Sequence, residues 1–257
     1  MSFSLKCMSF NLRVAVVSDG VNQFFNRAPR VLEVLEQEKP DLVGFQEVTD
    51  EMRSWLTGHL SGYTLQGCGR ERTCHGESML LGYRTGVCEL LALENKWLSP
   101  TPDVPGSTFG GDQSSCPRMV TSVLLRHNES PQPFRFYNTH LDHAGAQARY
   151  LGAMELIQMI SGRPEPFVLT GDFNATPDTP EIRLITEALA GRGVADATRG
   201  LPGTFHDFGR IPEVERERID YIFTDGKSLG AYAVPDNPVA GQYYSDHHAV
   251  VASIELP

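Results

Sequence analysis

Lysine is scarce in this sequence, and that scarcity bears on which partners the chain can bind. Only four of the 22 basic residues are lysine, and the formal net charge is −10. Non-specific binding to duplex DNA normally needs a broad basic face, because phosphate neutralisation supplies most of the affinity. Arginine instead favours discrete bidentate contacts with phosphate. The composition therefore favours small phosphorylated compounds or short single strands, although a negative total is compatible with a local basic patch.

Long hydrophobic runs and paired cysteines are also missing. No stretch reaches the roughly 20 apolar residues of a membrane helix, and the amino terminus enters a strand-like pattern without a preceding signal-peptide pattern. The five cysteines include no Cys-x-x-Cys pair, and the spacing of Cys68, Cys74 and His75 is irregular for a zinc site. These absences predict reduced thiols, no membrane anchor and a cytoplasmic location.

The remaining pattern predicts a single α/β domain over residues 1–257. A hydrophobic content of 40% is ample for one core. Apolar residues at helical spacing predict helices over 30–37 and 148–160. Strands are predicted at 78–83, 87–93, 119–126, 134–141, 219–224 and 249–255. Polar segments at 22–29, 67–76 and 99–117 are expected to be loops that select the substrate. Sheets packed on each other with helices outside follow from this order.

The segment Gly171-Asp172-Phe173-Asn174 directly follows a short apolar run. Residues two apart on a strand share a face, so Asp172 and Asn174 are expected to lie side by side. In that arrangement the carboxylate can accept a proton from an attacking water while the carboxamide orients the water. The alternative is a simple turn, because Asn, Asp and the following Pro177 are frequent turn residues.

Similar side chains lie beside the ends of other strand-like runs. They are Asn11, Glu47, His140, Asp220, Asp246 and His247. For any one of them a solvated cap or a packed histidine is the simpler explanation. Their joint occurrence in this order favours metal-assisted phosphate chemistry.

With these motifs the chain resembles the endonuclease/exonuclease/phosphatase superfamily, the DNase I-like group. This group includes exonuclease III-like apurinic endonucleases, poly(A)-specific deadenylases, sphingomyelinases and inositol polyphosphate 5-phosphatases. The resemblance extends from Asn11 to His247. The segments at 97–102, 138–143 and 203–206 are similar to those of the small, single-domain prokaryotic members. The resemblance implies a four-layer α/β sandwich, with two mixed sheets inside and the site at one rim of strand ends.

The resemblance also implies a divalent metal site. Glu47, supported by Asn11 and Asp246, is the expected ligand set, and its oxygen atoms suit Mg²⁺ or Mn²⁺ better than zinc. Asp172 is expected to orient or deprotonate the attacking water. Asn174 would hold that water or a phosphate oxygen.

Two histidines complete the implied site. His247 would donate a hydrogen bond to the negative charge that develops on the phosphate, and Asp220 would fix its tautomer. A second imidazole, His140, would be supported in a similar way by Glu77.

Two arginines, Arg118 and Arg149, are candidate phosphate contacts, with structural ion pairs as the alternative.

The sequence thus predicts a metal-dependent hydrolase of phosphoric esters that uses direct in-line attack by water, because no activated serine or cysteine is evident. The expected substrate is a nucleotide, an RNA end or a small phosphorylated compound, with no membrane or obligate protein partner. A DNA endonuclease or apurinic-type exonuclease is the alternative, and a non-catalytic binding module is a third reading.

Overall fold

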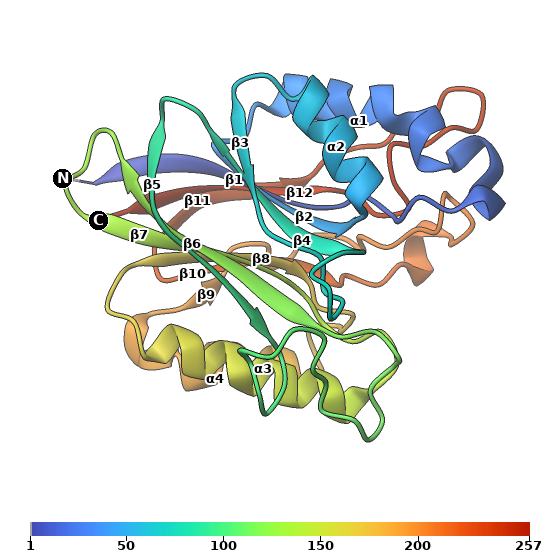
Figure 1. Ribbon diagram of the computed structural model, residues 1–257. Helices are drawn as coiled ribbons and strands as arrows, with labels where there is room; N and C mark the ends of the chain where they lie inside the picture. Colours follow the sequence, from blue (N-terminus) through green and yellow to red (C-terminus); the bar gives the residue numbers. More distant parts are fainter. Residues whose placement is uncertain (1) are drawn as a thin grey trace.

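The computed structural model describes residues 2–257, in which two six-stranded sheets pack face to face (Figure 1). The first sheet has the order β11 (Lys227–Ala233), β12 (Val250–Leu256), β1 (Phe3–Asn11), β2 (Leu42–Val48), β4 (Ser78–Arg84) and β3 (Tyr63–Gln66). The second has the order β5 (Cys88–Trp97), β6 (Met119–His127), β7 (Pro133–His140), β8 (Phe167–Asp172), β10 (Asp220–Thr224) and β9 (Ala195–Asp196). Both are mixed sheets. In the first, β1 is parallel to β2 and antiparallel to β12. In the second, β8 is parallel to β7 and antiparallel to β10.

Helices cover the outer face of each sheet. α1 (Phe24–Glu38) and α2 (Asp50–His59) lie over the first sheet, and α3 (Ala146–Ser161) and α4 (Pro180–Ala188) lie over the second (Figure 1). Short 3₁₀ segments occupy Val17–Asn22, Ala190–Arg192 and Glu213–Glu215. This arrangement confirms the predicted four-layer sandwich. Within residues 2–257, no helix combines the length and apolar character needed to cross a membrane.

Helix α1 begins earlier than the sequence pattern predicts, at Phe24 instead of position 30. The side chain of Gln23 caps its first turn by accepting a hydrogen bond from a main-chain N–H. Phe24 is fully buried, and the buried guanidinium of Arg27 donates to main-chain carbonyls, among them that of Tyr244. The polar residues and Pro29 predict a loop in this segment. Burial and these hydrogen bonds make it helical instead.

The alternation of side chains along β1 decides which of them face the second sheet. Leu5 and Cys7 pack between the sheets, whereas Met8 and Phe10 pack against the helices of the first sheet. Asn11 is the last residue of the strand and shares the parity of Leu5 and Cys7. Regular strand geometry therefore points Asn11 toward the second sheet, at the end of β1.

A buried polar network crosses between the sheets near these strand ends. The Asn138 side-chain oxygen in β7 accepts hydrogen bonds from Gln46 Nε2 at 2.7 Å and Thr170 Oγ1 at 3.1 Å. Asn138 Nδ2 donates to the carbonyl of Phe45 at 2.8 Å. Gly44 provides the space, since a Cβ atom there would lie 2.1 Å from Thr170 Oγ1. The network therefore fixes β2 of the first sheet against β7 and β8 of the second.

Replacing Asn138 by alanine should lower the free energy of unfolding by about 2 to 4 kcal/mol, because it removes the buried hydrogen bonds that join β7 to the Gln46 amide and to the Phe45 carbonyl. Urea unfolding followed by circular dichroism measures this change. Asn237→Ala, at an exposed position, is the matched control and should stay within about 0.5 kcal/mol of the wild type. Equal stability of the two variants would show that the network does not hold the sheets together.

Candidate active site

A cavity of about 580 Å³ lies where strands of both sheets end. The predicted site residues that line it are Glu47, Glu77, Arg118, His140, Asp172, Asn174, Asp246 and His247. Asn11 and Asp220 lie directly behind them, because each is hydrogen-bonded to a lining residue. The fold therefore brings every predicted site residue to this cavity except Arg149.

Glu47 reaches the cavity through a break in the regular geometry of β2. The pairing of β2 with β4 shifts register between Phe45 and Val48, and Glu47 has a φ of 63°. Regular alternation would give Glu47 the same orientation as Phe45, toward the helices. The bulge turns its carboxylate into the cavity instead. A non-glycine residue in this left-handed region costs about 1 to 3 kcal/mol, which the surrounding contacts must offset.

Asn11 connects two carboxylates from different sheets. Its Nδ2 donates to Glu47 Oε1 at 3.1 Å and to Asp172 Oδ2 at 2.9 Å, while its Oδ1 accepts from the main-chain N–H of Arg13 at 2.8 Å. Glu47 Oε2 accepts from the main-chain N–H of Val14 at 2.8 Å. Burial raises the pKa of Glu47, but these hydrogen bonds and nearby positive charge outweigh burial and lower it. Glu47 is therefore ionised at neutral pH, with Asn11 fixing its position.

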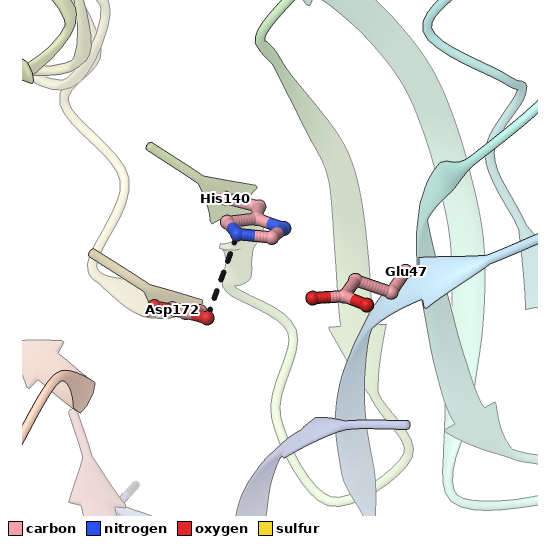
Figure 2. A group of neighbouring side chains, drawn as sticks. All are labelled: Glu47, His140 and Asp172. Atoms are coloured by element: carbon pink, nitrogen blue, oxygen red, sulfur yellow. Dashed lines mark ion pairs between the residues drawn. The ribbon is translucent and has the colours of Figure 1, made fainter. Parts of the chain in front are cut away.

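Asp172 lies between two strands that each present a functional side chain. It pairs in register with His140 on β7 and with Asp220 on β10. His140 Nε2 is 3.5 Å from Asp172 Oδ2, and Figure 2 shows the carboxylate of Glu47 facing both residues. His140 Nε2 also accepts a hydrogen bond from Asn174 Nδ2 at 2.9 Å. Burial holds the pKa of His140 well below its usual value, so its imidazole is neutral at pH 7.

Asn174 reaches the cavity by a turn, and the expectation that it shares a strand face with Asp172 is wrong. β8 ends at Asp172, and Asn174 follows with a φ of 48°. The main-chain N–H of Asn174 donates to Asp172 Oδ1 at 2.9 Å, which is the local hydrogen bond typical of Asx turns. The segment is therefore a turn that also places both side chains in the cavity.

His247 carries a positive charge in this site. Its Nδ1 lies 2.9 Å from Asp220 Oδ2, and its Nε2 lies 3.8 Å from Asp172 Oδ2. Burial lowers the pKa of His247, but Asp220 and the neighbouring carboxylates raise it to about 10. Burial and the charge of Asp220 raise the pKa of Asp172 to about 7, against the opposing charge of His247. The site thus combines an imidazolium with a carboxyl group that titrates near neutrality.

The donor set around Glu47 fits a hard divalent cation. Ligand atoms of Glu47, His140 and Asp172 all lie within 4.8 Å of one another, and Asp246 lines the same cavity. Burial and the charge of Glu47 raise the pKa of Asp246, so a cation between these carboxylates would relieve their repulsion. A donor set dominated by carboxylate oxygens suits Mg²⁺ or Mn²⁺.

Two predicted roles are corrected by the contacts. Glu77 does not support His140, because its Oε1 accepts from Arg70 Nη2 at 2.6 Å, and His140 Nδ1 has no hydrogen-bond partner within residues 2–257. Arg149 lies outside the cavity and donates from Nε to Glu181 Oε1 at 2.9 Å, which joins α3 to α4. Spacing along the chain did not reveal either pairing, because Arg149 and Glu181 are 32 residues apart, and the loop between Arg70 and Glu77 has no regular period.

Further side chains line the cavity without having been predicted. Arg13 Nε lies 3.8 Å from Asp246 Oδ2, and the ring of Phe205 packs on that of His247 with centroids 4.9 Å apart. Arg13 lies just after the first predicted strand, and that position could have identified it as a candidate site residue. Arg70 also lines the cavity, and only its position in the polar segment 67–76 pointed to it.

Comparisons with known proteins agree with this geometry. A family model described as the Endonuclease/Exonuclease/phosphatase family matches residues 8–247. The chain belongs to this family. Its members are hydrolases that act on phosphoester bonds, which confirms the predicted superfamily and the predicted class of enzyme. The family typically uses a divalent metal ion.

Solved structures of family proteins are similar over nearly the whole chain. An endonuclease/exonuclease/phosphatase from Bacteroides vulgatus has a TM-score of 0.91 and 30% identity, covering 99% of this chain and 100% of its own. A mannosyl-6-phosphatase from Bacteroides thetaiotaomicron has a TM-score of 0.87 and 26% identity, covering 97% of this chain and 99% of its own. An uncharacterised protein of Acanthamoeba polyphaga mimivirus is 25% identical over 167 residues, and the match spans 60% of each chain.

Asp220→Asn should lower the pKa of His247 from about 10 toward its ordinary value, because it removes the charge that most favours the imidazolium. At pH 8 the wild-type ring should be protonated and the variant ring largely neutral. NMR titration of the histidine ring protons in chelator-treated protein measures this difference. The control is Asp178→Asn, at an exposed carboxylate, which should leave His247 unchanged. An identical His247 titration in Asp220→Asn would contradict the assigned pairing.

Proposed function

We propose that this protein is a Mg²⁺- or Mn²⁺-dependent phosphoesterase that hydrolyses a small phosphorylated compound by direct in-line attack of water. The observation that carries the proposal is the meeting of Asp172, Asn174 and the His247–Asp220 pair in one cavity beside a cluster of carboxylates. These groups match the needs of phosphoryl transfer to water, namely a proton acceptor, an orienting amide and a cationic donor.

Each residue has a defined task in the proposed reaction. Glu47 and Asp246 would hold the metal ion, which when bound supplies charge that offsets the negative charge on the phosphate. Asp172 accepts the proton of the attacking water, since a carboxyl group with a pKa of about 7 is suited to this transfer near neutral pH. Asn174 orients the water. His247 donates from Nε2 to the phosphate oxygen on which charge accumulates, and Asp220 holds its ring through Nδ1.

Several features support a small phosphomonoester as the substrate. The net charge of −10 and the scarcity of lysine disfavour a duplex-binding track. The cavity of about 580 Å³ is in the range of small-molecule sites. The structurally similar protein from Bacteroides thetaiotaomicron is a mannosyl-6-phosphatase, which favours a phosphorylated sugar or a compound of comparable size as the substrate.

Phosphate release from a panel of substrates tests this function. The panel contains sugar phosphates, nucleotides, a bis-phosphodiester, single-stranded RNA and DNA, and abasic duplex DNA, each assayed with Mg²⁺, Mn²⁺ or chelator. We expect metal-dependent turnover that is fastest on a small phosphomonoester and falls about 10²- to 10⁴-fold in Asp172→Asn, because the proton acceptor is lost. Faster cleavage of the abasic duplex would favour the endonuclease alternative, and binding without turnover would favour a binding module.

Glu47→Gln should raise the metal concentration needed for half-maximal activity at least about tenfold, because it removes a charged oxygen ligand from the proposed site. Titration of activity against Mg²⁺ and Mn²⁺ measures the change. Glu129→Gln, at an exposed position, is the matched control. A metal titration that is the same in Glu47→Gln and the wild type would refute the ligand assignment.

A further inference from the structure

Two buried arginines, Arg70 and Arg118, line the cavity on the side of His140. Each side chain is about 95% buried. Within residues 2–257, Nε and Nη1 of Arg70 and Nη1 of Arg118 have no hydrogen-bond partner. Buried guanidinium groups normally have their donors satisfied, because an unpaired buried polar atom costs about 1 to 3 kcal/mol. Three unpaired nitrogens in one cavity wall therefore point to a missing acceptor.

Arg70 is held rigidly by its surroundings. Its main-chain N–H donates to the carbonyl of Glu77 at 2.9 Å, and its carbonyl accepts from Trp97 Nε1 at 2.6 Å. Its Nη2 donates to Glu77 Oε1 at 2.6 Å. The side chain is thus fixed at one nitrogen, while the other two are buried without a hydrogen-bond partner within residues 2–257.

Arg118 is fixed in a similar way by the segment that follows His140. Its Nε donates to Asp142 Oδ2 at 3.2 Å, and its Nη2 donates to His143 Nδ1 at 2.7 Å. Asp142 also accepts hydrogen bonds from the main-chain N–H groups of Ser114 and Gly145. Asp142 is therefore shared among several donors and compensates the charge of Arg118 only in part.

The electrostatics of this wall favour an anion. Burial lowers the pKa of Arg118, and the nearby positive charge of Arg70 lowers it further, so the two guanidinium groups repel each other. Burial raises the pKa of Glu77, which weakens it as a counter-ion for Arg70. The neighbouring His140 is neutral. An oxyanion bound between the arginines would satisfy their free N–H groups and relieve their repulsion.

The wall is separate from the groups that the proposed reaction uses. Glu47, Asp172 and His247 provide the carboxylates and the imidazolium for the phosphate that is hydrolysed. Arg70 and Arg118 contact none of these three side chains by a hydrogen bond or an ion pair within residues 2–257. A cavity of about 580 Å³ has room for a compound that reaches both groups of residues.

We infer that Arg70 and Arg118 bind a second phosphate group of the substrate, one that is not hydrolysed. The protein then prefers small organic compounds that carry two phosphates over those that carry one. This inference rests on the proposed function, because it takes the first phosphate to be bound beside Glu47 and His247. Arg70 and Arg118 act in this scheme as residues that determine specificity.

The test compares a hexose monophosphate with the corresponding hexose bisphosphate. We expect the wild type to have the higher kcat/KM for the bisphosphate. In Arg70→Gln the ratio of the two kcat/KM values should fall about 10- to 100-fold, as expected for the loss of a charged hydrogen-bonding group. Arg70→Lys should keep part of the preference, because it keeps the charge but loses the fork of donors. Arg199→Gln, at an exposed position, is the control and should leave both values unchanged.

Two outcomes would overturn the inference. One is a wild type without preference for the bisphosphate, which does not depend on the folding of any variant. The other is an Arg70→Gln protein that unfolds normally but loses activity on both compounds in equal proportion, since the arginines would then serve the hydrolysed phosphate.

Calorimetric binding of the same two compounds to chelator-treated protein separates this inference from the proposed function. If neither compound is hydrolysed, tighter binding of the bisphosphate that is lost in Arg70→Gln would still support the two-arginine site. Equal binding of the two compounds to the wild type would contradict it.

Discussion

The hydrogen bonds of Asn138 are the constraint on which the rest of the site depends. Asn138 joins β7 to Gln46 and to the carbonyl of Phe45 in β2, so it sets how the two sheets meet. Glu47 follows next on β2, and His140 lies two residues farther along β7. Each sheet supplies only part of the candidate site. A change in how the sheets are packed would therefore separate Glu47 and Asn11 from the residues of the second sheet.

The site concentrates features that are unfavourable for stability and useful for binding. Glu47 and Asn174 adopt left-handed backbone conformations, and several carboxylates are buried close together. Asn11 and His247 offset part of that repulsion through hydrogen bonds and charge. A bound cation would offset more of it. The acid-rich side of the cavity thus fits a metal ion, whereas the arginine-lined wall fits an anion, and a phosphorylated compound bound through that metal ion would meet both sides.

The general fold could be predicted from the sequence, but not its details. Helical spacing identified α3, and alternation or apolar runs identified most of the long strands, whose side chains are largely buried. The start of α1 was missed because the burial of Phe24 and Arg27 depends on distant segments. α2, α4 and the peripheral strands β3, β9 and β11 were also missed. The three strands are short or half-exposed, so alternation along them is weak, and the two helices are only 10 and 9 residues long.

The sequence by itself determined which chemistry the chain carries, because carboxylates, amides and imidazoles follow apolar strands at recognisable positions such as Asn11, His140 and Asp172. Only the tertiary structure decided how these groups are paired. Glu77 pairs with Arg70 across an irregular loop and not with His140, and Arg149 joins two helices by pairing with a residue 32 positions along the chain. The orientation of Glu47 likewise depends on a bulge against β4, since regular alternation in β2 would turn its side chain away from the cavity.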